Sequence, residues 1–184
     1  KVVPLFLVAA LFSQQETDDH ILTSTKKLAL ETQDTAALNR ILFSNSFDRK
    51  SAEYRKRCYE LAYRFHYFSM PYPTVESKKL QSAYENSEYG RTNIRNDQAP
   101  LRFYKNEKQV NIDTRQTLKK IQYMNIKLFG IYGKQDRIFS NKQLGDIRQI
   151  IGNKRFDLIE NCPHYPFGDQ QQQFIDYIEK FMIK

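Results

Sequence analysis

The order of apolar and polar residues along the chain separates a strand-and-helix tail from a helical middle. In the tail, Ser140 or Asn141 is placed to cap a helix and Gly152 to end it. The order strand, helix, strand, helix predicts a parallel sheet covered by helices. The expected elements are a strand over residues 126–133, a helix over 140–151, a strand over 155–160, a loop over 161–168 and a helix over about 169–182.

The first thirteen residues have two interpretations. One is a signal peptide, with a basic start and an apolar stretch that ends in small residues. The other is a buried parallel strand, since a short continuous apolar run is followed by polar residues. Pro4 suits the start of a strand, and the sequence opens on Lys1 where a signal peptide would have Met. We favour the strand, which would join the sheet of the tail.

The middle of the chain has helical periodicity. Thr17, Asp18 and Asp19 are expected to cap a helix whose apolar positions run to Leu42. The pattern then predicts a break at 44–46, a helix over roughly 48–68 ended by 70–73, a helix over about 74–89, a mixed loop over 90–108 and a short helix from 113 or 114 to about 121.

Composition narrows the class of protein. The chain has 184 residues, of which 40% are hydrophobic, which fits one globular domain with or without an insertion. The net charge of +8 would suit nucleic acid or an anionic membrane, or a solvated basic surface. No glycine-rich RNA-binding motif, zinc-finger spacing or heptad repeat accompanies the basic residues, so we expect no nucleic-acid partner. No apolar run reaches the roughly 18 residues that a membrane-spanning helix needs.

The two cysteines and three histidines are scattered. Cys58 and Cys162 lack a pairing motif, and two free, partly buried thiols are the simpler interpretation, although geometry decides whether a bridge forms. His20, His66 and His164 form no ligand cluster with them, so no metal site is expected.

Two polar residues follow the predicted strands of the tail. Asp136 comes after Gly133 in Gly-Lys-Gln-Asp, and His164 follows the strand ending at Glu160 in Asn-Cys-Pro-His. Their positions are 28 apart along the chain, enough for one crossover helix and one strand. Adjacent parallel strands would bring both loops to the edge of the sheet where active sites lie. A carboxylate beside an imidazole makes the histidine a general base, although each residue alone fits a turn or a solvated loop.

These residues resemble the C-terminal third of an α/β-hydrolase. The resemblance covers about 125–184 through Leu128–Asp136, Leu158–Phe167 and the helix from Phe174, and extends weakly to 1–10. It implies that Asp136 is the acid and His164 the base of a catalytic triad. The amino-acid sequence of the tail is most similar to that of proline iminopeptidase-like members of the family. The implied fold class is α/β, a partial α/β-hydrolase fold with three parallel strands, flanking helices and an inserted helical cap.

The resemblance also implies a division of the chain. Residues 1–16 would hold the first core strand, similar to the sixth strand of the family, 17–121 the helical cap and 122–184 the C-terminal core. The family's Gly-x-Ser-x-Gly nucleophile motif is absent, because no two of the six glycines flank a serine in that spacing. We therefore expect the C-terminal half of a hydrolase, without the nucleophile or the oxyanion-hole loop. Its first strand would have an unpaired apolar edge that promotes association.

The implied function is hydrolysis of an ester or amide bond, possible only with an upstream nucleophile, and without a cofactor. The expected partners are a small-molecule or peptide substrate and the missing N-terminal half, and the cytoplasm is the default compartment. Substrate-binding residues are unknown, although a cap carboxylate could bind a free amine. The alternatives are a non-catalytic binding or structural protein, and the back half of an epoxide hydrolase or haloalkane dehalogenase. The candidate amine-binding residues are Glu53, Glu60, Glu76, Glu85 and Glu88.

Overall fold

A three-stranded parallel sheet forms the centre of the protein. The structure is a computed structural model that describes residues 4–70, 73–92, 102, 105–106 and 112–182. The strands are β1 (Leu5–Val8), β2 (Leu128–Gly133) and β3 (Phe156–Ile159), in the order β1-β2-β3, with both pairings parallel. The prediction of three parallel strands with flanking helices is confirmed, and the favoured strand interpretation of the first segment holds for Leu5–Val8.

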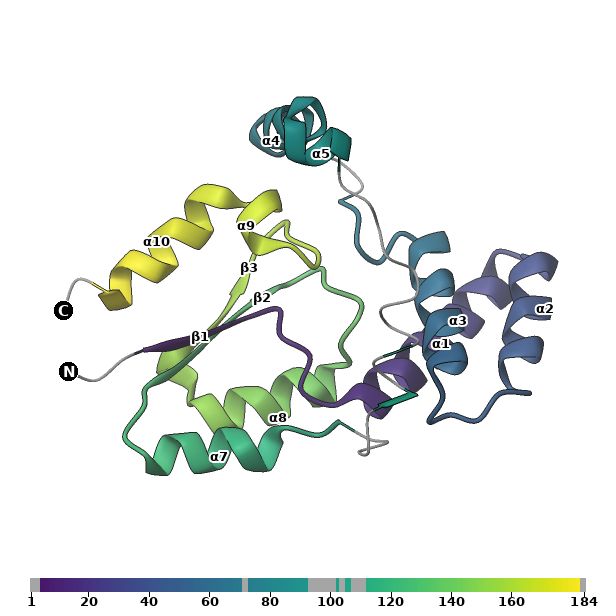
Figure 1. The fold of residues 1–184 in the computed structure, drawn as a ribbon, viewed down its shortest axis with the longest axis horizontal. Coiled ribbons are helices and arrows are strands. Elements are labelled where there is room, and N and C mark those ends of the chain that lie inside the picture. The colour runs from purple at the N-terminus through teal and green to yellow at the C-terminus, as the bar shows by residue number, and fades with distance from the viewer. Residues whose placement is uncertain (1–3, 71–72, 93–101, 103–104, 107–111, 183–184) are drawn as a thin grey trace.

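Helices cover both faces of the sheet (Figure 1). On one face, Leu128 and Tyr132 of β2 belong to a core with residues of α7 (Arg115–Tyr123) and α8 (Asn141–Ile151). On the other face, Phe129 and Ile131 pack with α10 (Gln171–Met182). Because every residue of β2 is buried, its continuous apolar run is what a strand covered on both faces requires.

Tyr177 fastens α10 to the sheet. Its hydroxyl lies 2.9 Å from the carbonyl oxygen of Gly130 in β2 and 2.6 Å from that of Arg155, which precedes β3. Arg155 belongs to a short 3-10 helix, η1 (Asn153–Arg155), between α8 and β3. Gly152 ends α8, as the sequence predicts, and its φ of +93° is a conformation that a side chain would strain.

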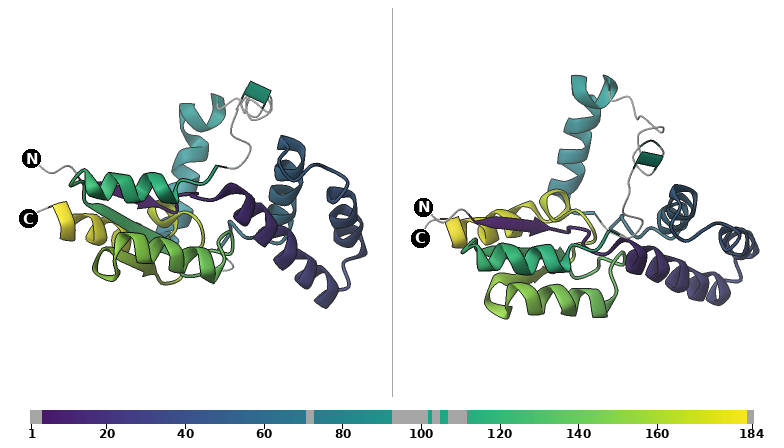
Figure 2. Two further views of the ribbon diagram at one scale, coloured as in Figure 1. Left: turned by 90° about the horizontal axis from the view of Figure 1, so that it is seen from below. Right: turned by 60° about the horizontal axis from the view of Figure 1, so that its bottom comes forward.

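The middle of the chain is helical. It contains α1 (Gln14–Glu31), α2 (Thr35–Ser44), α3 (Ala52–Arg64), α4 (Val75–Asn86) and α5 (Glu88–Thr92). α1 packs against α2 and α3, whereas α4 contains no buried residue and stands away from them (Figure 2).

The chain leaves the sheet region and returns to it at one point. The amide of Gln14 donates to the carbonyl of Ile112 at 2.9 Å, and the amide of Thr114 donates to the carbonyl of Phe12 at 2.8 Å. This is the geometry that an insertion between β1 and β2 needs. The assignment of 17–121 to a cap stays a prediction. At the end of that range, α7 lies beside α8 (Figure 1).

The predicted long helix up to Leu42 is wrong. The structure has two helices, because Gln33 adopts a φ of +54° and the side chain of Asp34 accepts a hydrogen bond from the amide of Ala37 to cap α2. The predicted N-cap at 17–19 is also wrong. The carbonyl of Ile112 already satisfies the amide of Gln14, so the helix begins at that residue and 17–19 lie inside it.

Three further boundaries differ from the predictions. α3 ends at Arg64, short of residue 68, since His66 takes a φ of +56°. The predicted loop over 90–108 begins inside α5, and residues 93–101, 103–104 and 107–108 lie outside the described residues. The predicted loop over 161–168 contains most of α9 (Pro166–Asp169), whose first residue is a proline that suits the first turn of a helix.

Candidate active site

Gly133 brings together the two loops that follow β2 and β3. A Cβ atom on Gly133 would lie 1.8 Å from the carbonyl oxygen of Pro163 and 2.1 Å from that of Cys162. Only glycine therefore lets the loop of β3 cross the end of β2. Gln135 secures the crossing: its amide donates to the carbonyl of Cys162 at 3.0 Å, and its side-chain oxygen accepts from the amide of Cys162 at 2.9 Å.

Asp136 and His164, predicted from the ends of the strands, are in contact. Nδ1 of His164 lies 2.9 Å from Oδ2 of Asp136, whose side chain is fully buried. The other carboxylate oxygen, Oδ1, accepts a hydrogen bond from the amide of Ile138 at 2.9 Å. Asp136 is thus both a turn residue bonded to its own loop and the partner of the histidine. The hydrogen bond from the amide of Ile138 fixes the orientation of the carboxylate, and this fixes the direction in which Oδ2 faces the imidazole.

This contact favours one tautomer of the neutral imidazole. An ionised carboxylate can only accept hydrogen bonds, so Nδ1 carries the proton that points to Asp136. In the neutral ring, Nε2 then keeps its lone pair and can take a proton from another molecule. The arrangement is that of a general base held by an acid.

Three aromatic rings surround the imidazole of His164. The ring centroids of Tyr165, Phe68 and Phe139 lie 5.1, 5.3 and 5.9 Å from that of the histidine. Phe68 follows α3, so the helical middle of the chain reaches the site. The imidazole side chain keeps 19% of its surface exposed, which leaves it accessible beside apolar walls.

A second histidine lies near the acid. Burial lowers the pKa of His20 on α1, and the carbonyl of Arg137 and the charge of Asp136 oppose that shift. The sequence offered no sign of this proximity, because 115 residues lie between His20 and Asp136. His164 remains the residue that bonds to the carboxylate.

An aromatic groove adjoins His164 on the side of α4 and α9. Its volume is about 980 Å³, and Phe68 and Tyr165 belong to its walls. Asp169 at the end of α9 also lines it. None of the five candidate glutamates lines this groove; Glu60, for example, pairs with Arg57 at 2.9 Å on α3. Sequence reasoning missed Phe68 and Asp169, because neither belongs to a motif.

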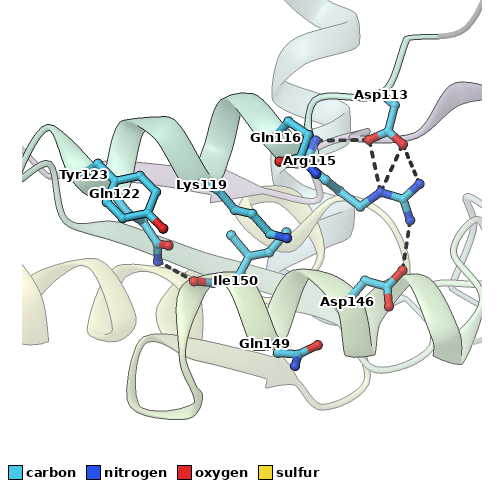
Figure 3. Close-up of a pocket in the computed structure, with 9 residues that line it drawn as sticks. All are labelled: Asp113, Arg115, Gln116, Lys119, Gln122, Tyr123, Asp146, Gln149 and Ile150. Atoms are coloured by element: carbon cyan, nitrogen blue, oxygen red, sulfur yellow. Dashed lines mark hydrogen bonds and ion pairs between the residues drawn. The ribbon is translucent and has the colours of Figure 1, made fainter.

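A different, polar groove of about 670 Å³ lies between α7 and α8 (Figure 3). Its charged residues compensate one another: the guanidinium of Arg115 contacts Asp113, Asp146 at 2.9 Å and, from α1, Glu16 at 2.9 Å. The side-chain amide of Gln122 donates to the carbonyl of Ile150 (Figure 3). These bonds join α1, α7 and α8. We therefore interpret this groove as a structural contact between the three helices.

Comparison of the chain with models of protein families, with curated proteins and with solved structures found no match. Within the described residues, no group of three or more histidine, cysteine and acidic side chains is arranged to hold a metal ion. Both cysteines are free, as the simpler interpretation had it, and both are fully buried where partial burial was expected. No helix in the described part of the chain is long and apolar enough to span a membrane. Fold and site define a parallel α/β protein with a fixed Asp–His pair at the strand ends.

Proposed function

We propose that Asp136 and His164 are the acid and base of a hydrolase of the α/β-hydrolase type. The observation that carries the proposal is the 2.9 Å contact between Nδ1 of His164 and Oδ2 of Asp136, in the loops after two adjacent parallel strands. The proposal includes a nucleophile supplied by a segment outside the 184 residues, because the sequence has no Gly-x-Ser-x-Gly motif.

The proposed reaction is cleavage of an ester or amide bond. Nε2 of His164 takes the proton of a serine hydroxyl as the oxygen attacks the carbonyl carbon, and then gives that proton to the leaving group. Water releases the acyl group from the serine in a second, equivalent step. Asp136 holds the ring and stabilises its protonated form throughout. This chemistry requires no cofactor.

A more specific proposal is that the enzyme has the substrate specificity of proline iminopeptidase-like enzymes. It requires a carboxylate that binds the free amine of a peptide. The five candidate glutamates contribute to neither of the two grooves described above, so this specificity has no assigned residue among them. A cytoplasmic location also stays a prediction.

A non-catalytic binding protein with the same fold is the second candidate. The absence of the nucleophile motif from the sequence and the net charge of +8 favour it. The residue at the nucleophile position distinguishes the candidates, since an aspartate there would indicate an epoxide hydrolase or haloalkane dehalogenase.

The test begins with the reading frame upstream of Lys1. A frame that continues to Gly-x-Ser-x-Gly supports the proposal, and a start codon directly before Lys1 favours the binding protein. In the complete enzyme, His164→Ala and Asp136→Asn should each lower kcat for an activated ester by a factor of about 10⁴. Unchanged turnover in His164→Ala, with the melting temperature preserved, would remove His164 from the mechanism.

A further inference from the structure

The groove beside His164 has the size and walls of a small-molecule site. Its volume of about 980 Å³ is at the upper end of the range of ligand pockets, roughly 300–1,000 Å³. Most of its lining is aromatic or aliphatic, and it comes from the end of α3 and the segment after it, from α4 and from α9. The apolar lining residues include Tyr63, Phe68, Met70, Leu80, Tyr84 and Phe167.

The groove shares two aromatic walls with the candidate active site, although His164 itself does not line it. Phe68 and Tyr165 line it, and the same two rings contact the imidazole of His164 at centroid distances of 5.3 and 5.1 Å. A molecule in the groove would therefore contact Phe68 and Tyr165, the same rings that pack against His164. These shared walls favour a part of the substrate as the occupant over a protein partner that binds elsewhere.

The apolar lining is left open to solvent on both sides of the groove. Leu80 and Tyr84 of α4 are 41% and 50% exposed, and Phe167 of α9 is 52% exposed. α4 buries none of its own residues, although it contacts α9. An apolar group placed between the two helices would cover these side chains and remove their surface from water.

The charge of the groove is opposite to that of the chain. The chain carries 29 lysines and arginines, yet none of them is among the described residues that line the groove. Of the described residues that line the groove, Asp169 carries the charge, and its Oδ2 accepts a hydrogen bond from the amide of Tyr165 at 3.3 Å. Burial raises the pKa of Asp169 and the nearby His164 opposes that shift, so the carboxylate is partly withdrawn from water. Among the described lining residues, no lysine or arginine would compensate the repulsion between this carboxylate and an anionic ligand.

We propose that the groove between α4 and α9 binds an uncharged aromatic or branched aliphatic group of the substrate, and that Asp169 excludes carboxylates from it. The inference rests on the proposed function and names the substrate class: neutral esters or amides with a bulky apolar group. Asp169 is then a specificity-determining residue, separate from the pair that performs the chemistry.

The test uses the chain as it is, with two probes of nearly equal shape. 4-Phenylbutyramide is neutral and 4-phenylbutyrate is anionic at pH 8, and NMR titration gives both affinities together with the ring signals of His164, assigned with His164→Gln. We expect the amide to shift the His164 signals and the acid to bind at least tenfold more weakly. Asp169→Asn should bring the acid to within about threefold of the amide.

A matched pair of variants on α4 locates the site. Leu80→Ser removes a lining side chain and should weaken binding of the amide at least fivefold. Val75→Ser removes an apolar side chain of the same helix that is 61% exposed and outside the groove, and should leave the affinity unchanged. Both positions are exposed enough for the fold to tolerate the change, and circular dichroism of each variant is the check.

Three results would overturn the inference: equal affinity for amide and acid in the unaltered chain, no effect of Leu80→Ser, or binding that leaves the His164 signals in place. Failure of the proposed function is a separate result, since it appears as full turnover in His164→Ala of the complete enzyme. In that case, binding of the amide with the expected variant effects would still establish the groove as a site for neutral apolar molecules.

Discussion

Replacing Asp18 should stabilise the protein at neutral and alkaline pH. Asp18 lies inside α1, is 1% exposed and faces Arg55 and Cys58 of α3. Neither of its carboxylate oxygens makes a hydrogen bond of normal geometry within the described residues, although the nearby side chain of Gln14 acts to lower its pKa. Burial raises its pKa from 3.8 to about 7, and the charge of Arg55 offsets only part of that effect. Asp18→Asn removes the ionisation and retains the shape of the side chain.

The magnitude follows from the difference between the two pKa values. The folded state holds the proton of Asp18 more tightly than the unfolded chain, so folding loses stability as the pH rises from about 4 to about 7. A difference of about 3 pH units, at about 1.4 kcal/mol for each, sets an upper limit of about 4 kcal/mol above pH 7. Asp18→Asn has no ionisable group at this position, so the variant does not lose stability in this way. Below pH 4 both forms carry a neutral side chain, and ionisation no longer distinguishes them.

Urea denaturation of both proteins at pH 4, 6 and 8, at one ionic strength, measures the effect. The free energy of unfolding of Asp18→Asn should exceed that of the unaltered chain by an amount that grows with pH. A difference that is constant from pH 4 to 8, or a variant that is less stable at pH 8, would refute the reasoning.

Asp34→Asn is the control with the opposite sign. The amide of Ala37 and the ion pair with Arg64 lower the pKa of Asp34. Its ionised form therefore stabilises the fold above the ordinary pKa of an aspartate, and that contribution disappears as the pH falls. The variant should be the less stable protein at pH 8, and its deficit should shrink on acidification.

Three further predictions test other parts of the structure. Tyr177→Phe leaves the carbonyls of Gly130 and Arg155 without their shared donor and should cost roughly 1–3 kcal/mol in urea denaturation; an unchanged free energy would disprove that anchoring role. Burial raises the pKa of Cys58 and of Cys162 to about 12, so both thiols should react with a disulfide reagent at pH 8 only in denaturant, and fast reaction of the folded protein would contradict their burial. β1 has β2 as its one neighbour among the described strands, and Leu5 is 38% exposed. Light scattering at micromolar concentration should therefore detect association that Leu5→Lys reduces, and a monodisperse monomer would count against a sticky edge.

The sequence determined those elements whose signals are local. An apolar run predicts β2, alternation predicts β3, and the cap at Ser140 and the glycine at 152 bound α8 closely. Because parallel strands end at the same edge of a sheet, the sequence also predicted that Asp136 and His164 would meet, and they do. That inference needed the order of the strands and no knowledge of packing.

The tertiary structure alone decided the features that depend on distant segments. α1 begins at Gln14 because Ile112 supplies its first acceptor, across almost a hundred residues of chain. Phe68 reaches His164 from the helical middle, and Asp169 becomes the charge of the groove only because α4 lies opposite α9. Hydrophobic periodicity specifies which face of an element is buried, but it does not name the residues that cover that face. Those partners are chosen by packing, which involves the whole chain at once.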